Sequence, residues 1–159
     1  MSTVRIEITN YCNRRCPYCF FKEKLTDKKV EMSLEEFNLV LDYCERDNID
    51  FVFIQGGEPT THTKFVEILH ILQKRGFSYI LFTNGIFPTR FLDELHQDKR
   101  DGILLNYNHP DTYSSIKEWE LVNRNISEMV NRKIKFELGY TLSLIHISEP
   151  TRPLYTSYA

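Results

Sequence analysis

Short runs of β-branched and aromatic residues alternate in this chain with longer segments whose apolar residues recur at helical spacing. The run at 51–55 is almost continuously apolar, as in a strand that is buried on both faces. In 113–131 the apolar residues return every three or four positions, which indicates an amphipathic helix. The predicted strands are 4–9, 51–55, 79–83, 103–107 and 135–142, and the predicted helices are 33–46, 64–74, 89–96 and 113–131.

Repeated alternation of strand and helix predicts an α/β fold of parallel strands joined by right-handed crossovers. Periodicity alone does not distinguish an open sheet from one rolled into a barrel, but in both cases ligands bind at the carboxyl ends of the strands. Four predicted strands deliver polar or ligand-type residues to that edge. These residues are Cys12 after the first strand, 56–59 after the second, 83–85 after the third, and 106–108 at the end of the fourth.

Length and composition are those of one globular domain, or of part of a larger one. The 159 residues are 42% hydrophobic and carry a net charge of −2. No apolar run is long enough to span a bilayer, and the start of the chain has no apolar signal segment. We therefore expect a cytoplasmic protein with no membrane partner, and the charge balance gives no clear nucleic-acid signal.

Three cysteines, Cys12, Cys16 and Cys19, fall within eight residues after the first predicted strand. Three thiolates can hold three irons of a cubic iron–sulfur cluster and leave the fourth iron open. A closed zinc site normally needs four ligands, and Cys44 would have to be the fourth. Because Cys44 falls on the apolar face of the helix predicted at 33–46, it is expected to pack as a small hydrophobe. The alternative is a non-catalytic zinc or iron–sulfur module that uses all four cysteines.

The second candidate motif, Gly56-Gly57-Glu58-Pro59, directly follows the second predicted strand. Two glycines let the backbone turn sharply and approach a ligand closely. Pro59 restricts Glu58 to an extended conformation, so that its carboxylate is aimed and can hold an ammonium group of a bound cofactor. The alternative is an ordinary glycine turn with a solvated Glu58.

The two motifs together resemble the radical S-adenosylmethionine (radical SAM) superfamily, over approximately residues 4 to 141. The resemblance rests on Cys12-x-x-x-Cys16-x-x-Cys19, with Tyr18 before the last cysteine, and on the loop 56–59. It implies a partial (β/α)6 TIM-like barrel, truncated here after about five strands. It also implies a 4Fe–4S cluster on the three cysteines, whose open iron binds S-adenosylmethionine. Reductive cleavage then yields a 5′-deoxyadenosyl radical that takes a hydrogen atom from a substrate.

The same resemblance assigns further residues to S-adenosylmethionine. The backbone at Tyr18 would lie near the adenine, and Gly56, Gly57, Glu58 and Pro59 would bind the methionine amino group. Asn84 and Asn108 are candidates for the carboxylate or the ribose, with an asparagine that caps a strand end or turn as the alternative. His62 and His109 lie near the same edge, but we expect helix-entry or surface roles and place neither in a catalytic set.

Partners beyond S-adenosylmethionine are less well specified. Six basic residues crowd the cysteine loop: Arg14, Arg15, Lys22, Lys24, Lys28 and Lys29. A low-potential electron donor of the flavodoxin or ferredoxin type could dock there, although nearby acidic residues favour a solvated loop. The substrate stays open among peptides or proteins, a glycyl-radical enzyme and small molecules or nucleotides.

The end of the chain has a different character. Residues 142–152, Leu-Ser-Leu-Ile-His-Ile-Ser-Glu-Pro-Thr-Arg, resemble the translation of a transposon-based sequencing-library adapter, and 153–159 resemble its index and primer. We expect residues 1–141 to be an incomplete radical SAM core and 142–159 to be non-native. An incomplete barrel exposes apolar faces, so the expressed chain is expected to be poorly soluble and weakly active.

Overall fold

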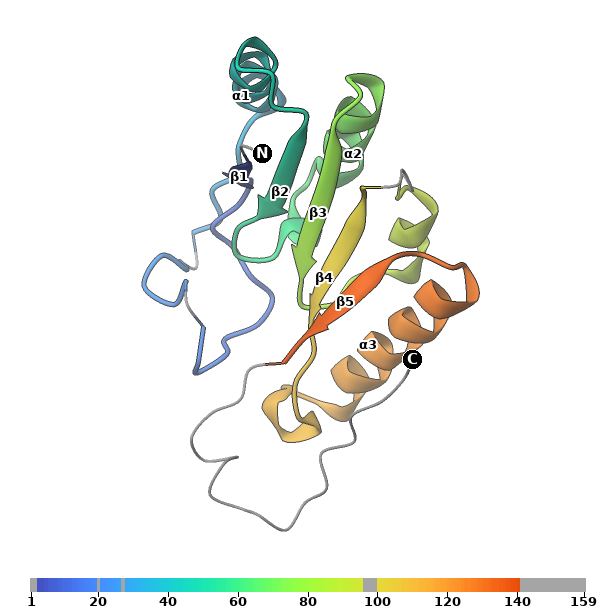
Figure 1. Cartoon of the computed structure of the whole chain (residues 1–159). Coiled ribbons are helices and arrows are strands. Elements are labelled where there is room, and N and C mark those ends of the chain that lie inside the picture. Colours follow the sequence, from blue (N-terminus) through green and yellow to red (C-terminus); the bar gives the residue numbers. More distant parts are fainter. Residues whose placement is uncertain (1–2, 20, 27, 96–99, 141–159) are drawn as a thin grey trace.

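A computed structural model describes residues 3–19, 21–26, 28–95 and 100–140. Within these residues five strands form one parallel sheet in the order β1-β2-β3-β4-β5, and their arrowheads point the same way in Figure 1. The strands are β1 (Val4–Glu7), β2 (Phe51–Gln55), β3 (Ser78–Thr83), β4 (Gly102–Asn106) and β5 (Phe136–Gly139). The predicted alternation is confirmed. The expected strand end at 141–142 and the segment 142–159 lie outside the described residues, so the boundary at 141 stays a prediction.

The order of the strands selects between the two architectures that the sequence left open. Neighbours in the sheet are also neighbours along the chain, with no reversal of order. Because parallel crossovers are right-handed, an unreversed order places every crossover on the same face of the sheet. A doubly wound sheet reverses its order and carries helices on both faces. The sheet is therefore of the barrel type, in agreement with the expected partial barrel.

The described residues contain three α-helices: α1 (Leu34–Arg46), α2 (Phe65–Lys74) and α3 (Ile116–Asn131). A capping box starts α1, since the Ser33 hydroxyl accepts from the N–H of Glu36 and the Glu36 carboxylate accepts from the N–H of Ser33. Ser115 caps α3 by accepting from the N–H of Glu118. This cap explains why α3 begins at Ile116 and not at the predicted residue 113. None of these helices is long and apolar enough to cross a membrane.

The crossover between β3 and β4 differs from the prediction. In place of an α-helix over 89–96, the described residues form the 3-10 helix η2 (Thr89–Asp93). Pro88, at the N-cap, offers no side-chain hydrogen bond to start a longer helix, and a short helix without a cap is costly to nucleate. Two more 3-10 helices, η1 (Pro59–Thr61) and η3 (Pro110–Thr112), follow β2 and β4.

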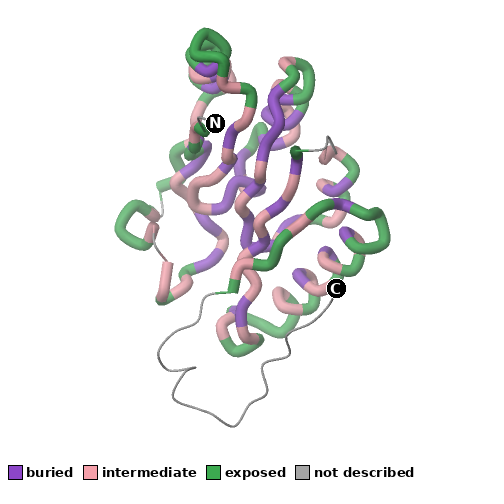
Figure 2. The backbone as a smooth tube through the Cα atoms, in the orientation of Figure 1, coloured by how far each residue is buried: buried purple, intermediate pink, exposed green. Residues whose placement is uncertain are grey.

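The two faces of the sheet are buried to different extents, and buried and intermediate residues alternate along β2 to β4 in Figure 2. On one face Ile54 and Leu105 are fully buried, in cores that include side chains of the helices. On the other face Phe53 and Phe82 are half-buried and meet edge to face, with ring centroids 5.7 Å apart. The helices thus cover one face, and the other is the face that a closed barrel encloses.

Candidate functional site

The cysteine loop leaves β1 and is hydrogen-bonded to the loop that follows β2. The N–H of Gly57 donates to the carbonyl of Thr9, and the N–H of Glu58 donates to the carbonyl of Tyr11, both at 2.8 Å. These bonds continue the β1–β2 pairing beyond the two strand ends. They place the residues just before Cys12 against the double glycine.

Both glycines are required by this contact. A Cβ at Gly57 would lie 2.2 Å from the carbonyl oxygen of Tyr11, and a Cβ at Gly56 would lie 2.4 Å from that of Thr9. Gly56 also has a φ of +146°, which residues with a side chain rarely adopt. The double glycine was predicted to let the backbone approach a ligand closely. In this structure it lets the loop 56–59 approach the backbone that precedes the cysteines.

The three cysteines of this loop are free thiols. Cys12 is buried, whereas Cys16 and Cys19 are half-buried, and a turn brings the N–H of Cys19 to the carbonyl of Cys16. Burial raises the pKa of the Cys12 thiol to about 11, and the negative charges of Glu58 and Cys16 add to this effect. A thiol must lose its proton to act as a metal ligand, and the surroundings of Cys12 hold that proton tightly.

The chemistry of the donor set fits an iron–sulfur cluster, because three free cysteine thiols lie on one loop. Among the described residues, no group of three or more His, Cys, Asp or Glu side chains is placed to hold one metal ion. A cubic cluster binds each thiolate at a different iron, so its sulfur ligands stand further apart than the ligands of one ion. Three free thiols on one loop are the ligands that such a cluster uses.

A buried cation beside the loop supports this fit. Arg14 is 3% exposed, with its guanidinium 4.2 Å from the centre of the Tyr113 ring and its Nη2 2.7 Å from the carbonyl oxygen of Thr112. Its Nη1 is buried and has no hydrogen-bond partner within the described part of the chain. A buried charge is costly unless an opposite charge lies near it. Iron–sulfur clusters carrying three thiolates are anionic and would supply that charge.

The burial of Arg14 reduces the number of exposed basic side chains around the cysteine loop. Arg14 does not reach solvent, Lys24 lies 3.6 Å from Glu7, and Lys29 lies 2.6 Å from Glu31. Half of the six basic residues are thus buried or paired with an acidic side chain. This arrangement favours the solvated loop over a docking surface for an electron donor.

Glu58 is 1% exposed, and both oxygens of its carboxylate accept hydrogen bonds from groups of the protein. Oε1 accepts from the N–H and the hydroxyl of Thr60, at 3.2 and 2.6 Å, and from the hydroxyl of Thr83 at 2.7 Å. Oε2 accepts from the N–H of Asn84 at 2.7 Å. Burial raises the pKa of Glu58, while these donors act in the opposite direction. The backbone before Pro59 is extended, as predicted, but the carboxylate joins β3 to the loop after β2 and is not solvated.

Asn84 brings the end of β3 to the cysteine loop. Its Nδ2 donates to Sγ of Cys12 at 3.7 Å and to Oδ1 of Asn13 at 2.8 Å. Its Oδ1 accepts from the N–H of Ile86 at 2.9 Å. Asn84 therefore faces a predicted cluster ligand with its amide group.

Of the remaining predicted residues, Tyr18 lies in the cysteine loop itself, and Asn108 follows β4. Burial, followed by the negative charge of Cys16, raises the pKa of the Tyr18 hydroxyl to about 12, and the hydroxyl oxygen is buried. Asn108 is buried at the end of β4, and its N–H donates to the hydroxyl of Tyr113 at 3.4 Å. Since the ring of Tyr113 lies under Arg14, Asn108 is linked to the cysteine loop through these two side chains.

Comparison with known proteins decides the family. A model of the radical SAM superfamily matches residues 6–138, which is most of the chain. The chain belongs to the radical SAM superfamily.

Two curated relatives illustrate the range of this radical SAM family. MJ1632 of Methanocaldococcus jannaschii, named for the activation of glycyl-radical enzymes, is 38% identical over 92 residues, which are 58% of this chain and 35% of that protein. The tungsten-containing aldehyde ferredoxin oxidoreductase cofactor-modifying protein of Pyrococcus furiosus is 30% identical over 143 residues, or 88% of this chain and 39% of that protein. The chain thus spans less than two fifths of the length of either relative.

Solved structures show the same fold at low identity. Streptococcus suis SuiB bound to its precursor peptide SuiA superimposes with a TM-score of 0.65 and 18% identity, over 92% of this chain and 35% of SuiB. SuiB bound to S-adenosylmethionine gives a TM-score of 0.59 and 12% identity, over 96% of this chain and 53% of that one. Both agree with a five-stranded portion of the radical SAM barrel.

The position of Cys44 excludes the four-cysteine alternative. Cys44 is 3% exposed and belongs to the core that also contains Phe37 and Leu41. Its carbonyl accepts from the N–H of Ile49 at 2.8 Å, just before β2 begins. Cys44 therefore lies at the amino end of the sheet, whereas Cys12 follows the carboxyl end of β1. The expected core role is confirmed, and a site with Cys44 as fourth ligand does not form.

His62 has the helix-entry role that was expected of it. Its Nδ1 accepts from the N–H of Lys64, and its Nε2 lies 2.9 Å from the carbonyl oxygen of Met32. The prediction missed Asn13 and Thr60, and it placed Thr83 at the functional edge without assigning it a role.

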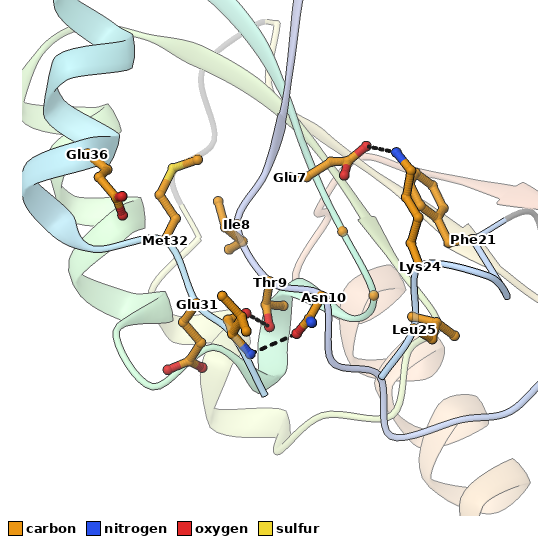
Figure 3. A pocket seen from close by; sticks show the side chains of 13 residues that line it. Glu7, Ile8, Thr9, Asn10, Phe21, Lys24, Leu25, Glu31, Met32 and Glu36 are labelled. Atoms are coloured by element: carbon orange, nitrogen blue, oxygen red, sulfur yellow. Dashed lines mark hydrogen bonds and ion pairs between the residues drawn. The ribbon is translucent and has the colours of Figure 1, made fainter. Parts of the chain in front are cut away.

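A cavity of about 460 Å³ adjoins the double glycine on the β1 side of the radical SAM core (Figure 3). Figure 3 shows Glu7 and Lys24 paired on one side of it, with Met32 and Glu36 on the opposite side. Gly56 and Gly57 belong to its lining, and the three cysteines of the loop do not. The cavity therefore borders the candidate site at the double glycine and not at the cysteines.

Proposed function

We propose that Cys12, Cys16 and Cys19 hold three irons of a 4Fe–4S cluster whose fourth iron binds S-adenosylmethionine. Family membership and the joining of the cysteine loop to the loop 56–59 support this proposal. The bound cluster supplies the electron that breaks a C–S bond of the sulfonium, giving methionine and a 5′-deoxyadenosyl radical that takes a hydrogen atom from substrate. The observation that carries the proposal is the set of three free thiols beside the double glycine.

The residues of the chain bind and orient S-adenosylmethionine. The backbone of 56–59 is proposed to accept the methionine amino group, because the Glu58 carboxylate is already filled by four donors. The backbone at Tyr18 is proposed to lie near the adenine, and Asn108 near the carboxylate or ribose. Asn84 is proposed to lie where this cofactor surface meets Cys12. Arg14 balances the negative charge of the loaded site.

The activity of the whole protein belongs to the same proposal, because the chain spans 35% and 39% of its two curated relatives. We propose an enzyme in the cytoplasm that takes its electron from a low-potential flavodoxin or ferredoxin. The relatives are named for glycyl-radical activation and cofactor modification, and SuiB binds a peptide. Peptide, protein and small-molecule substrates all stay compatible with the residues described.

Anaerobic reconstitution with iron and sulfide tests this proposal. The chain is expected to bind about four irons, turn brown and release 5′-deoxyadenosine from S-adenosylmethionine in the presence of dithionite. Cys12→Ala, Cys16→Ala and Cys19→Ala should each lose the cluster, and Cys44→Ala is the matched control that keeps it. Stoichiometric colourless zinc, or a cluster lost in Cys44→Ala and retained in Cys16→Ala, would overturn the proposal.

A further inference from the structure

The sulfur of Cys12 receives two hydrogen bonds from N–H groups of the protein. The backbone N–H of Arg14 donates to it at 3.4 Å, and the side-chain Nδ2 of Asn84 donates at 3.7 Å. Asn84 is distant in sequence, and its amide reaches the sulfur from the end of β3. This second donor is therefore built by the fold and is not a local property of the cysteine loop.

The orientation of the Asn84 amide is determined by its neighbours. The N–H of Ile86 needs an acceptor, and Oδ1 of Asn84 is that acceptor at 2.9 Å. The amide nitrogen must then point the other way, toward Sγ of Cys12 and Oδ1 of Asn13. Asn13 returns a bond from its own Nδ2 to the carbonyl of Ile86 at 2.9 Å. The bond from Ile86 thus determines which end of the Asn84 amide faces the sulfur, and Asn13 adds an acceptor beside it.

Glu58 fixes the backbone from which this donor extends. Its Oε2 accepts from the N–H of Asn84 at 2.7 Å, and its Oε1 accepts from the hydroxyl of Thr83. Glu58 and Cys12 are both buried, and Asn84 is 9% exposed. In such surroundings hydrogen bonds to a charged sulfur act more strongly than in water. The half-buried Cys16 and Cys19 are accessible to water in a way that Cys12 is not.

We propose that Asn84 is a positioning residue that raises the reduction potential of the cluster, by donating its side-chain N–H to the sulfur of Cys12. This inference rests on the proposed cluster. Reduction adds one electron to the cluster and makes its thiolate sulfurs more negative, so an N–H donor stabilises the reduced form more than the oxidised form. Asn84 thereby makes the cluster easier to reduce by a biological donor.

Redox titration of the reconstituted chain tests this inference, with the midpoint potential as the readout. Asn84→Ala removes the donor, and Asn84→Asp keeps the size of the side chain and the acceptor for Ile86 but replaces the donor by an anionic oxygen. Both variants should bind the same amount of iron as the wild type. Loss of one hydrogen bond to a charged group should lower the equilibrium constant for reduction about tenfold, which is about 59 mV for one electron. The shift in Asn84→Asp should be larger.

The matched control is Asn13→Ala, which also loses the Asn13–Asn84 bond but leaves the donor on Cys12 in place. It should change the melting temperature as much as Asn84→Ala does and leave the midpoint potential close to the wild-type value. In resonance Raman spectra, exchange into D2O should shift an Fe–S(Cys) band of the wild type and of Asn13→Ala by the same amount, and the shift should be smaller in Asn84→Ala, which keeps only the Arg14 N–H donor.

The possible failures are distinguishable. A wild-type chain that binds no cluster would overturn the proposed function. A wild-type chain with a cluster, together with Asn84 variants of unchanged potential, would overturn this inference and leave the proposed function intact. Equal shifts in Asn84→Ala and Asn13→Ala would also overturn it, because loop structure would then be the cause. If Asn84→Ala does not fold, Asn84→Leu, which keeps the side-chain volume, adds no charge and also lacks the N–H donor, takes its place and should lower the potential by the same amount.

Discussion

The backbone N–H of Asn84 lies 2.7 Å from Oε2 of Glu58, and this bond joins the end of β3 to the loop after β2. The same carboxylate accepts from Thr60 and Thr83, while the N–H of Glu58 donates to Tyr11 in the cysteine loop. Three segments therefore meet at one buried residue: the end of β3 and the loop after β2 at its carboxylate, and the cysteine loop at its backbone N–H. Glu58 therefore holds the segments of the candidate site together, through contacts that do not require a bound cofactor.

Replacement of Glu58 by Gln should destabilise the chain even without a cluster. The new amide keeps the volume but directs N–H groups at donors that need an acceptor, and hydrogen bonds to a charged group are worth about 1.5–3 kcal/mol. We expect a loss of about 2 kcal/mol in the free energy of urea unfolding. Glu120→Gln, on the exposed side of α3, is the control and should leave stability unchanged. Equal free energies of unfolding for the two variants would show that the Glu58 carboxylate does not stabilise the packing of these segments.

The double glycine gives a second prediction. A Cβ at Gly57 would lie 2.2 Å from the carbonyl oxygen of Tyr11, so Gly57→Ala must push the cysteine loop away from the loop 56–59. We expect a lower melting temperature and less iron bound after reconstitution. At Gly102 in β4 the nearest atom is the carbonyl oxygen of Lys135, 3.7 Å away, which makes Gly102→Ala the matched control. Full iron binding by Gly57→Ala would contradict this account of the glycines.

The sequence predicted the fold well where periodicity and caps act locally. The capping residue Ser33 and the apolar repeat after it predict α1 closely, and the continuous apolar run 51–55 coincides with β2. The helix predicted at 89–96 was wrong, because the spacing of its apolar residues is compatible with packing from a short 3-10 helix as well. The spacing of apolar residues predicts which side of a segment is buried. It does not distinguish an α-helix from a 3-10 helix.

The candidate site was predicted as a set of residues but not as a set of contacts. The carboxyl-end rule brought Cys12, Glu58 and Asn84 to one edge correctly. It did not indicate that Glu58 faces Thr60, Thr83 and Asn84, because those bonds depend on how three loops pack. Arg14 was counted among surface charges for the same reason. Its burial over Tyr113 depends on a segment about 100 residues away in sequence, which no local pattern reveals.

A third prediction concerns Asn125 of α3, which is hydrogen-bonded to the loop that carries Asn84. It is fully buried on α3, where its Nδ2 donates to the carbonyls of Gly85 and Phe87 and its Oδ1 accepts from the Thr89 hydroxyl. Asn125→Ala leaves these partners without a bond and should cost about 2–4 kcal/mol in unfolding free energy. Asn131→Ala, at the exposed end of α3, should have little effect. A loss below about 1 kcal/mol in Asn125→Ala would mean that water replaces the lost bonds.

The contacts of Glu31 predict how the free energy of unfolding changes as the pH falls. Partial burial raises the pKa of this carboxyl, but the Lys29 ammonium and the hydroxyl and N–H of Thr63 outweigh that effect and lower the pKa from 4.5 to about 2. A carboxyl with a lower pKa in the folded state stabilises that state above its unfolded pKa, and the gain is lost as the pH falls. We therefore expect Glu31→Gln to be less stable than the wild type at pH 7, with the difference shrinking between pH 4.5 and 2. Urea unfolding at pH 7, 4.5 and 3 measures this difference.

Thr63→Val tests the cause of that acid dependence, because it removes the hydroxyl that donates to Oε2 of Glu31 at 2.6 Å and keeps the backbone N–H donor. With one donor fewer, the folded pKa of Glu31 lies nearer its ordinary value. The acid-dependent part of the stability should then be smaller than in the wild type, and it should be lost over a narrower pH window that ends above pH 2. If the wild type and Glu31→Gln instead differ by a constant amount from pH 7 to pH 3, the Glu31 contacts stabilise the fold through packing and not through charge.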